Sequence, residues 1–265
     1  MADSFFTTRD NHWFQPTSHT RGPWDANHCH AGPPTGMIAR ALEQLLPGQR
    51  LTRLTVNLIR PVPFSGFQIT TEVTRTGRIV SISTAALLDH DGKQCVTATA
   101  LHMTPQSNTP FPTLHNDPVY KPEDAVPGKF PIEKSLHNMP SFKDDGVSVM
   151  YPEGQTNKPG PTISWLRTVP LLPDETPSAF QRICPLADCG NAFSRNAEPW
   201  EVNFMNPDLT LLLHRDPVGE WLGTDAQSHW QPDGIGMSDA RLFDQRGSVG
   251  RAIQTLLLRT SDVTC

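Results

Sequence analysis

The chain repeats itself. Shifted against itself by 155 residues, so that Thr55 falls on Thr210, it shows ten identities over residues 54–101 without a gap. Chance would give roughly three, and self-similarity at a fixed offset indicates a duplicated structural unit. In the first copy the shared residues are Leu54, Thr55, Leu58, Arg60, Ser83, Ala85, Leu87, Asp89, Gly92 and Leu101. The 265 residues therefore divide into two similar units rather than one large domain.

Proline separates the two copies. Eleven of the 26 prolines fall between residues 105 and 161. Proline fixes φ and has no N–H to donate, so this stretch is expected to be neither central sheet nor long helix. We expect an N-terminal unit over residues 1–104, a proline-rich linker over residues 105–160 that is partly ordered against its neighbours, and a C-terminal unit over residues 161–265.

The first copy has the pattern of one helix followed by strands. After an N-terminal strand, apolar residues recur at helical spacing from Met37 to Leu45, with Pro33 and Pro34 in the first turn and Pro47-Gly48 at the end. Alternating segments then predict strands near residues 51–60, 67–75, 79–89 and 94–103.

The second copy repeats this order. A strand near residues 162–167 precedes a helical region over residues 178–193, which is expected to break or restart at Pro185. Further strands are predicted near residues 209–215, 220–228, 236–243 and 249–259. One helix and about five antiparallel strands in each copy predict an α+β fold in which each sheet curls round its helix and the two sheets pair side by side.

Composition limits the partners of such a fold. The net charge is -5, so a basic face that grips nucleic acid is not expected. No run of about 18 apolar residues occurs, which predicts no membrane-spanning helix. The first ten residues lack the pattern of a signal peptide, and the five widely spaced cysteines suit reduced thiols. We expect a cytoplasmic protein with neither a nucleic-acid nor a membrane partner.

Short motifs in both copies resemble one family. The motifs are His30-Ala31-Gly32-Pro33-Pro34-Thr35-Gly36, Arg60-Pro61-Val62-Pro63, Arg75-x-Gly77-Arg78, Ala187-Asp188-Cys189-Gly190-Asn191, Asn206-Pro207-Asp208, Leu213-His214-Arg215 and Gln254-Thr255-Leu256. In this order, and with the duplication, they resemble acyl-CoA thioesterase II-like proteins of the thioesterase-like superfamily. The resemblance implies a double hotdog: two antiparallel sheets, each wrapped round a central helix, paired into one larger sheet.

The resemblance also implies an activity in lipid metabolism, the hydrolysis of an acyl-CoA thioester to a free acid and CoA without a metal or organic cofactor. In that family an Asp, a Thr or Ser, and a Gln of the second hotdog hold the attacking water. The resemblance assigns these roles to Asp208, Ser228 and Gln254. His229 is the alternative to Ser228, because a one-residue slip in a strand reverses the face that a side chain presents. The resemblance also implies that His30, Gly32 and His229 contact the substrate.

These residue types suit the chemistry. Thioester hydrolysis needs a polarised water and donors for the developing oxyanion. Asp208 would accept the proton of the water, and the first N–H groups of the helix near Gly32 would face the oxyanion, with Gly32 letting the substrate approach closely. Gln254 gains independent support from its strand, where it shares a face with Ala252 and Leu256 and must find polar partners.

Structural explanations compete with these roles. Asp208 follows Asn206-Pro207, where a turn alone favours Asp. Gln254 can satisfy a neighbouring backbone group, and Ser228 can be an ordinary strand serine. The run His28-Cys29-His30 could form a metal site or a Cys-His pair. Its i, i+2 spacing makes a poor metal site, and we expect no metal.

Two other functions remain open. A hotdog protein can be a non-hydrolytic biosynthetic enzyme or an acyl-thioester-binding protein, because fold does not determine function. A hydratase-like enzyme would use His30 or His229 as base on an acyl thioester. The sequence leaves open the acyl group and whether the protein is a homo-oligomer.

Overall fold

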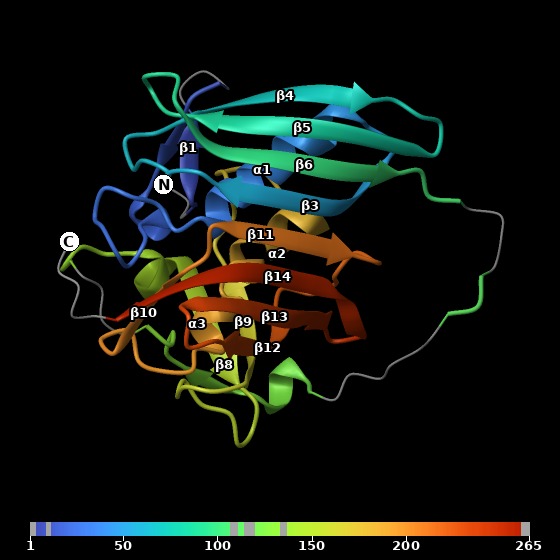
Figure 1. Cartoon of the computed structure of the whole chain (residues 1–265). Helices are drawn as coiled ribbons and strands as arrows, with labels where there is room; N and C mark the ends of the chain where they lie inside the picture. The colour runs from blue at the N-terminus through green and yellow to red at the C-terminus, as the bar shows by residue number, and fades with distance from the viewer. Residues whose placement is uncertain (1–3, 9–11, 107–110, 114–119, 133–136, 261–265) are drawn as a thin grey trace.

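Two α+β units share one antiparallel sheet in the computed structural model (Figure 1), which describes residues 4–8, 12–106, 111–113, 120–132 and 137–260. The sheet has 12 strands, in the order β4-β5-β6-β3-β11-β14-β13-β12-β9-β8-β7, and β10 pairs with β14 beside this path. The double hotdog and its α+β class are confirmed, with one sheet running through both units. Within the described residues no helix is long and apolar enough to cross a membrane.

The first unit follows the sequence pattern closely. Its helix α1 (Gly32–Leu45) begins with prolines in the first turn, where their missing N–H groups cost nothing. Its strands are β3 (Arg50–Leu58), β4 (Gln68–Arg75), β5 (Val80–Leu88) and β6 (Gln94–Met103). Before them, β1 (Phe6–Thr8) and β2 (Phe14–Pro16) form a separate two-stranded sheet, and a 3-10 turn, η1, covers Ser18–Thr20.

The second unit repeats the order with a divided helix. Its helices are α2 (Ala179–Ala187) and α3 (Gly190–Phe193). Its strands are β9 (Thr162–Thr168), β10 (Val202–Met205), β11 (Asp208–Leu213), β12 (Leu222–Trp230), β13 (Ile235–Asp244) and β14 (Gly247–Thr260). The helical region is interrupted, but the expected position at Pro185 is wrong: Pro185 lies inside α2, which ends two residues later at Ala187. One proline removes a single backbone bond, which the packing around α2 tolerates.

The proline-rich stretch contributes two strands to the edge of the large sheet, on the side of the second unit. It contains the strands β7 (Val126–Gly128) and β8 (Val147–Tyr151), which extend the sheet at its edge beyond β9, together with the short helical turns η2 (Pro122–Asp124) and η3 (Phe142–Gly146). An edge is where a sheet accommodates proline, because one side of an edge strand has no ladder to complete. The division of the chain at residues 104 and 161 remains a prediction.

The two units meet at β3 and β11. Thr55 lies opposite Thr210, the residue onto which the 155-residue shift carries it, and their hydroxyl oxygens are 3.1 Å apart. Asn57 pairs with Asp208 and Arg53 with Leu212 on either side of this pair. The register is symmetric about Thr55 and Thr210, so the duplication in the sequence appears as an approximate two-fold relation across this strand pair.

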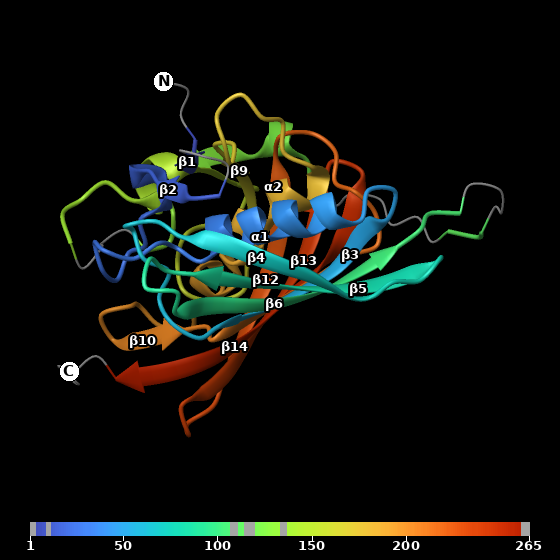
Figure 2. The same ribbon diagram turned by 90° about the horizontal axis from the view of Figure 1, so that it is seen from above.

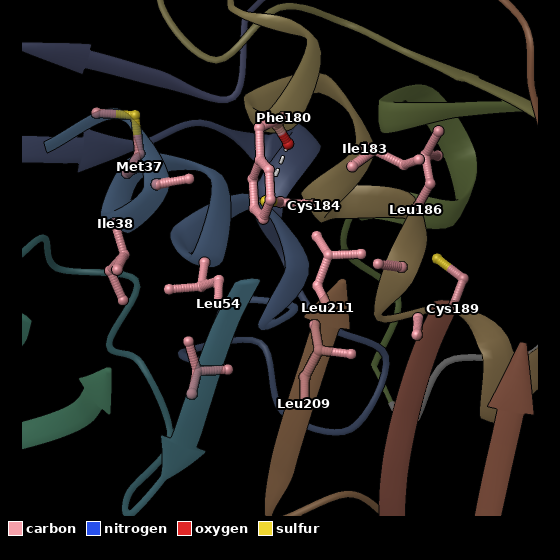
Figure 3. Close-up of a cluster of buried hydrophobic side chains, with 14 of the residues drawn as sticks. Met37, Ile38, Leu54, Phe180, Ile183, Cys184, Leu186, Cys189, Leu209 and Leu211 are labelled. Atoms are coloured by element: carbon pink, nitrogen blue, oxygen red, sulfur yellow. Dashed lines mark hydrogen bonds between the residues drawn. The ribbon is translucent and has the colours of Figure 1, made fainter. Parts of the chain in front are cut away.

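The main core lies between the helices and the sheet. Helices α1 and α2 pack against each other on the same face of the sheet (Figure 2). Between them, buried side chains of both helices meet Leu54 of β3 and Leu209 and Leu211 of β11 (Figure 3). Burial of such side chains is the main stabilising term, at about 1.5–3 kcal/mol for each one. The close contact of the helices brings the N-terminus of α1 next to the C-terminus of α2.

Candidate active site

A buried carboxylate marks the place where the two helices meet. Asp188 follows the last residue of α2, and its side chain is only 5% exposed. Its Oδ1 accepts hydrogen bonds from Nδ2 of Asn206 at 2.8 Å and from Nε2 of Gln254 at 3.1 Å. Its Oδ2 lies 3.2 Å from Nδ1 of His30. Oδ1 therefore has two amide donors, and Oδ2 faces the imidazole.

Gln254 is oriented from both ends of its amide. It lies on the inward face of β14 and is 1% exposed. Its Nε2 also donates to the backbone oxygen of Asp188 at 3.2 Å, and its Oε1 accepts from the backbone N–H of Asn191 at 3.1 Å. The polar partners expected for Gln254 are thus the backbone and carboxylate of the α2–α3 junction.

Asn206 is held at the bend between β10 and β11. Its Nδ2 also donates to the backbone oxygen of Asp208 at 3.1 Å, and its Oδ1 accepts from Nδ2 of Asn191 at 3.3 Å. These bonds fix which end of the amide faces Asp188. Asn206 therefore presents a donor to the carboxylate, like Gln254.

His30 comes from the first unit, two residues before α1. Its ring stacks on Phe142, with centroids 4.2 Å apart and an interplanar angle of 17°. Burial lowers the pKa of His30, although the Asp188 carboxylate opposes this shift. Burial raises the pKa of Asp188, while His30 and the donors Asn206, Gly32 and Gln254 oppose that shift. Both shifts disfavour the charged forms, as expected for ionisable groups removed from water.

His30 and Asp188 can share one proton. The backbone N–H of Gly32 donates to Nδ1 of His30 at 3.2 Å. While Nδ1 accepts that bond, it can bond Oδ2 only if the carboxyl carries the proton. When Nδ1 carries the proton, it donates to the carboxylate instead. The pair can thus hold a proton on either partner, and the raised pKa of Asp188 suits a base that is poised closer to neutral pH.

The structure does not bring Asp208 and Gln254 together. Side chains alternate along a strand, and Asp208 points to the outward face of β11 while Leu209 points inward. Oδ1 of Asp208 accepts from the backbone N–H of Thr255 at 2.7 Å. Thr255 is exposed on β14, whereas its neighbour Gln254 is buried, so the Asp208 and Gln254 side chains lie on opposite faces of the sheet.

Ser228 and His229 also separate by strand alternation. Ser228 is buried on the inward face of β12, in register with Ser238, which in turn pairs with Gln254 on β14. Its hydroxyl lies 2.7 Å from that of Ser194. His229 is exposed on the opposite face. Ser228 thus lies two strands away from Gln254, and its described hydrogen bond leads to Ser194 at the end of α3 rather than to the carboxylate.

Gly32 serves the packing of the helices. A Cβ at this position would lie 2.7 Å from the backbone oxygen of Pro185, so the missing side chain lets α1 and α2 approach closely. The close approach is to α2, where we had expected a substrate. Residues 33 and 34 are prolines without N–H groups, and Thr35 donates to Ala31. Among residues 32–35, Gly32 therefore supplies the N–H that faces the His30–Asp188 pair.

The run His28-Cys29-His30 does not converge on one point. Nδ1 of His28 lies 3.5 Å from Asp25, and Sγ of Cys29 donates to the backbone oxygen of Pro63 at 3.7 Å. His30 alone reaches Asp188. Over the part of the chain that the structure describes, His, Cys, Asp and Glu side chains form no group of three or more that could hold a metal ion.

A cavity of about 350 Å³ lies between α2 and β9, and its lining does not include the side chains bound to Asp188. Its buried walls include Leu171, Pro185, Leu186 and Leu222, and Arg167 and Glu220 lie at its exposed rim. Pro185 lines the cavity and also contacts Gly32. Pro185 therefore joins one wall of this mainly apolar cavity to the contact between α1 and α2.

Sequence reasoning gave no role to Asp188 or Asn206, although both lie in the motifs that carried the resemblance. A signal for Asp188 was present: it is the only acidic residue between Ala179 and Phe193, in a stretch that is otherwise mostly apolar. An acid in such a stretch is unusual unless it is paired or functional. Asn206 offered no comparable signal, because Asn-Pro is common in turns.

Two models of known protein families match the sequence, one for each half of the chain. Residues 20–103 match the acyl-CoA thioesterase N-terminal domain, and residues 122–258 match the acyl-CoA thioesterase C-terminal domain. No curated protein matches the sequence significantly.

Solved structures share the fold at low sequence identity. A proposed thioesterase from Novosphingobium aromaticivorans is 17% identical, with a TM-score of 0.75 over 97% of this chain and 100% of that one. Acyl-CoA thioesterase II TesB2 from Mycobacterium marinum is 17% identical, with a TM-score of 0.65 over 97% and 96% of the two chains. Both halves of the sequence match the two domains of one family in the expected order, and the chain therefore belongs to the acyl-CoA thioesterases.

Proposed function

We propose that the protein hydrolyses an acyl-CoA thioester and that Asp188, rather than Asp208, is the general base. The observation that carries this proposal is the buried Asp188 carboxylate, with Asn206 and Gln254 bound to Oδ1 and His30 beside Oδ2. Family membership supports a thioester hydrolase. A carboxylate whose pKa is raised by burial is a better base near neutral pH than an exposed one.

The reaction uses Oδ2, the carboxylate oxygen that accepts no hydrogen bond from Asn206 or Gln254 and lies beside His30. Because Oδ1 already accepts two hydrogen bonds, a water bound on the Oδ2 side gives its proton to Oδ2 as its oxygen attacks the thioester carbonyl. The new C–O bond forms, and the C–S bond breaks as the tetrahedral intermediate collapses. The proton held by Asp188 then leaves with the thiolate, so the products are a free acid and CoA. The donor for the developing oxyanion is the N–H of Gly32, which faces the His30–Asp188 pair and binds Nδ1 of His30 before substrate arrives.

Purified protein should release free thiol from at least one of a panel of short, medium and aromatic acyl-CoAs. Asp188→Asn should lower kcat by about 10²–10⁴-fold, the usual contribution of a general base. Asp208→Asn is the matched control, because it changes the same group on the outward face, and it should stay within about threefold of wild type. Full activity in D188N with loss of activity in D208N would return the base to Asp208.

A second candidate function, hydration, is supported by the position of His30 beside Asp188. A hydratase-like enzyme would use this pair to add water across the double bond of an enoyl thioester, without releasing thiol. The same panel, extended to an enoyl-CoA, separates the two: loss of the enoyl absorbance without free thiol would favour hydration. A chain that binds acyl-CoA but does neither would be a binding protein.

A further inference from the structure

The segment between the two repeats reaches the candidate active site through one aromatic ring. Phe142 is the first residue of η3 and is 1% exposed. Its ring lies nearly parallel to the His30 imidazole, 4.2 Å away. One face of the His30 ring is thus covered by a residue from the proline-rich stretch.

We propose that Phe142 is a positioning residue, whose ring holds the His30 imidazole with Nδ1 toward Oδ2 of Asp188. This role rests on the proposed function, because it matters for the reaction only if Asp188 is the base. Imidazole rings rotate readily about χ2, and that torsion has a broad energy profile. A flat surface stacked on one face restricts this rotation without using either ring nitrogen, which leaves both nitrogens available for proton exchange.

Three interactions hold the segment that carries Phe142. Its backbone N–H donates to the oxygen of Arg21 at 2.9 Å, and Nη1 of Arg21 donates back to the oxygen of Pro140 at 2.6 Å. Ser141 and Asp144 form a capping box that starts the helical turn. A ring held in this way can hold a second ring, because its own position is determined by the backbone.

Other aromatic rings support Phe142 on its remaining sides. Phe5 stacks on it with centroids 5.9 Å apart and an angle of 19°, and Phe130 meets it edge-on at 6.0 Å and 89°. Phe130 in turn packs against Phe193 of α3 at 5.3 Å. The N-terminal hairpin, the inserted segment and the second unit therefore meet at the ring that covers His30.

The same contact keeps water from His30. Burial lowers the pKa of this imidazole, and Asp188 is the charged group that acts on it electrostatically. On η3 the charged side chains Lys143 and Asp144 pair with each other at 2.7 Å, and Asp145 is exposed to solvent. Loss of the Phe142 ring should therefore admit water and raise the pKa of His30 toward its ordinary value, through solvation rather than through a changed charge.

The test compares Phe142→Leu and Phe142→Met with Phe142→Tyr, which keeps the planar ring. The control is Phe130→Leu, because Phe130 contacts Phe142 but does not stack on His30. The first readout is an NMR titration of the His30 ring signals, assigned with His30→Gln. The second is the pH profile of kcat, with KM measured alongside. The NMR readout needs no turnover, so it stays informative if the proposed hydrolysis is not found.

Removal of the ring should raise the pKa of His30 and lower kcat about tenfold or more, with KM nearly unchanged, because the reacting groups are misplaced while binding surfaces remain. F142Y should recover most of the activity, and F130L should leave the His30 titration unchanged. An unchanged His30 titration in both F142L and F142M would overturn the proposal. So would a kcat that falls only in proportion to the lost folded fraction. If F142L does not fold, F142M provides the same comparison.

Discussion

Gln254 donates to Asp188 twice, to the backbone oxygen at 3.2 Å and to Oδ1 at 3.1 Å, from the same Nε2. The other end of its amide accepts from Asn191, so the reverse orientation would place an oxygen against the carboxylate and leave that backbone N–H without its acceptor. This relationship joins the end of α2 to the inward face of β14. It also fixes the carboxylate before any substrate binds, which is the preorganisation that lowers the cost of reaching a transition state.

The pH dependence of kcat should report the ionisation of Asp188. The base must be unprotonated, and burial raises its pKa above the ordinary 3.8, so activity should be lost as pH falls through a value above 3.8. Below this pKa, kcat should fall about tenfold for each pH unit. A pH–rate profile at saturating substrate measures it. Activity that persists unchanged to pH 4 would contradict the assignment.

Replacement of Asp188 should stabilise the fold while it removes activity. Folding raises the pKa of Asp188, so the ionised carboxylate lowers the free energy of unfolding. This destabilisation is absent below the pKa of the unfolded chain, grows as pH rises, and is complete above the pKa of the folded protein. Asn keeps an oxygen for Asn206 and Gln254 without the buried charge. At pH 8, D188N should be more stable by about 1 kcal/mol, or about 2–4 °C in Tm.

Thermal melts of D188N and wild type at pH 8 and pH 4 measure this effect, and the difference should shrink at the lower pH. D208N serves as the matched control, because Asp208 is on the outward face of the sheet. A D188N protein that melts below wild type at both pH values would show that the carboxylate stabilises the fold.

Removal of the Asn206 amide should reduce turnover more than binding. Asn206→Ala takes one of two donors from Oδ1 of Asp188, and kcat should fall about 10- to 100-fold. Asn206→Thr restores a donor on a shorter side chain and should recover part of the loss. Asn203→Ala, in the preceding strand β10, is the control and should remain near wild type. Equal activity in the Ala and Thr variants would indicate that the donor itself does not matter.

Thiol reagents should leave the folded enzyme active. Burial raises the pKa of Cys29 to about 12 and also raises that of Cys95, Cys184 and Cys189, so little reactive thiolate forms near neutral pH. Cys265 lies outside the described residues, and Cys265→Ser removes it from the experiment. Native C265S treated with iodoacetamide at pH 7.5 should keep its activity and gain no mass, whereas unfolded protein should gain four labels. Rapid inactivation would point to a cysteine with access to the site.

Much of the architecture could be predicted from local pattern. Alternation in β3 and β14 and the proline start of α1 are properties of short segments, and the strands lie within a few residues of their expected positions. Gln254 was identifiable because a polar residue on an apolar strand face needs a partner. The end of α2 was misjudged at Pro185, because the packing that preserves the helix there comes from α1, which is remote in the sequence.

The duplication, the order of elements and the inward position of Gln254 could be predicted from the sequence alone, since each depends on a periodicity along the chain. Which carboxylate Gln254 meets depends on how the helices pack in three dimensions. Asp208 lies across from β14 but on the other face of the sheet, while Asp188 reaches Gln254 from the end of a helix 66 residues earlier. Strand alternation keeps the Asp208 side chain out of the interior. Asp188 is brought to Gln254 by the packing of α2 on α1 and the sheet, a long-range contact that no local sequence pattern encodes.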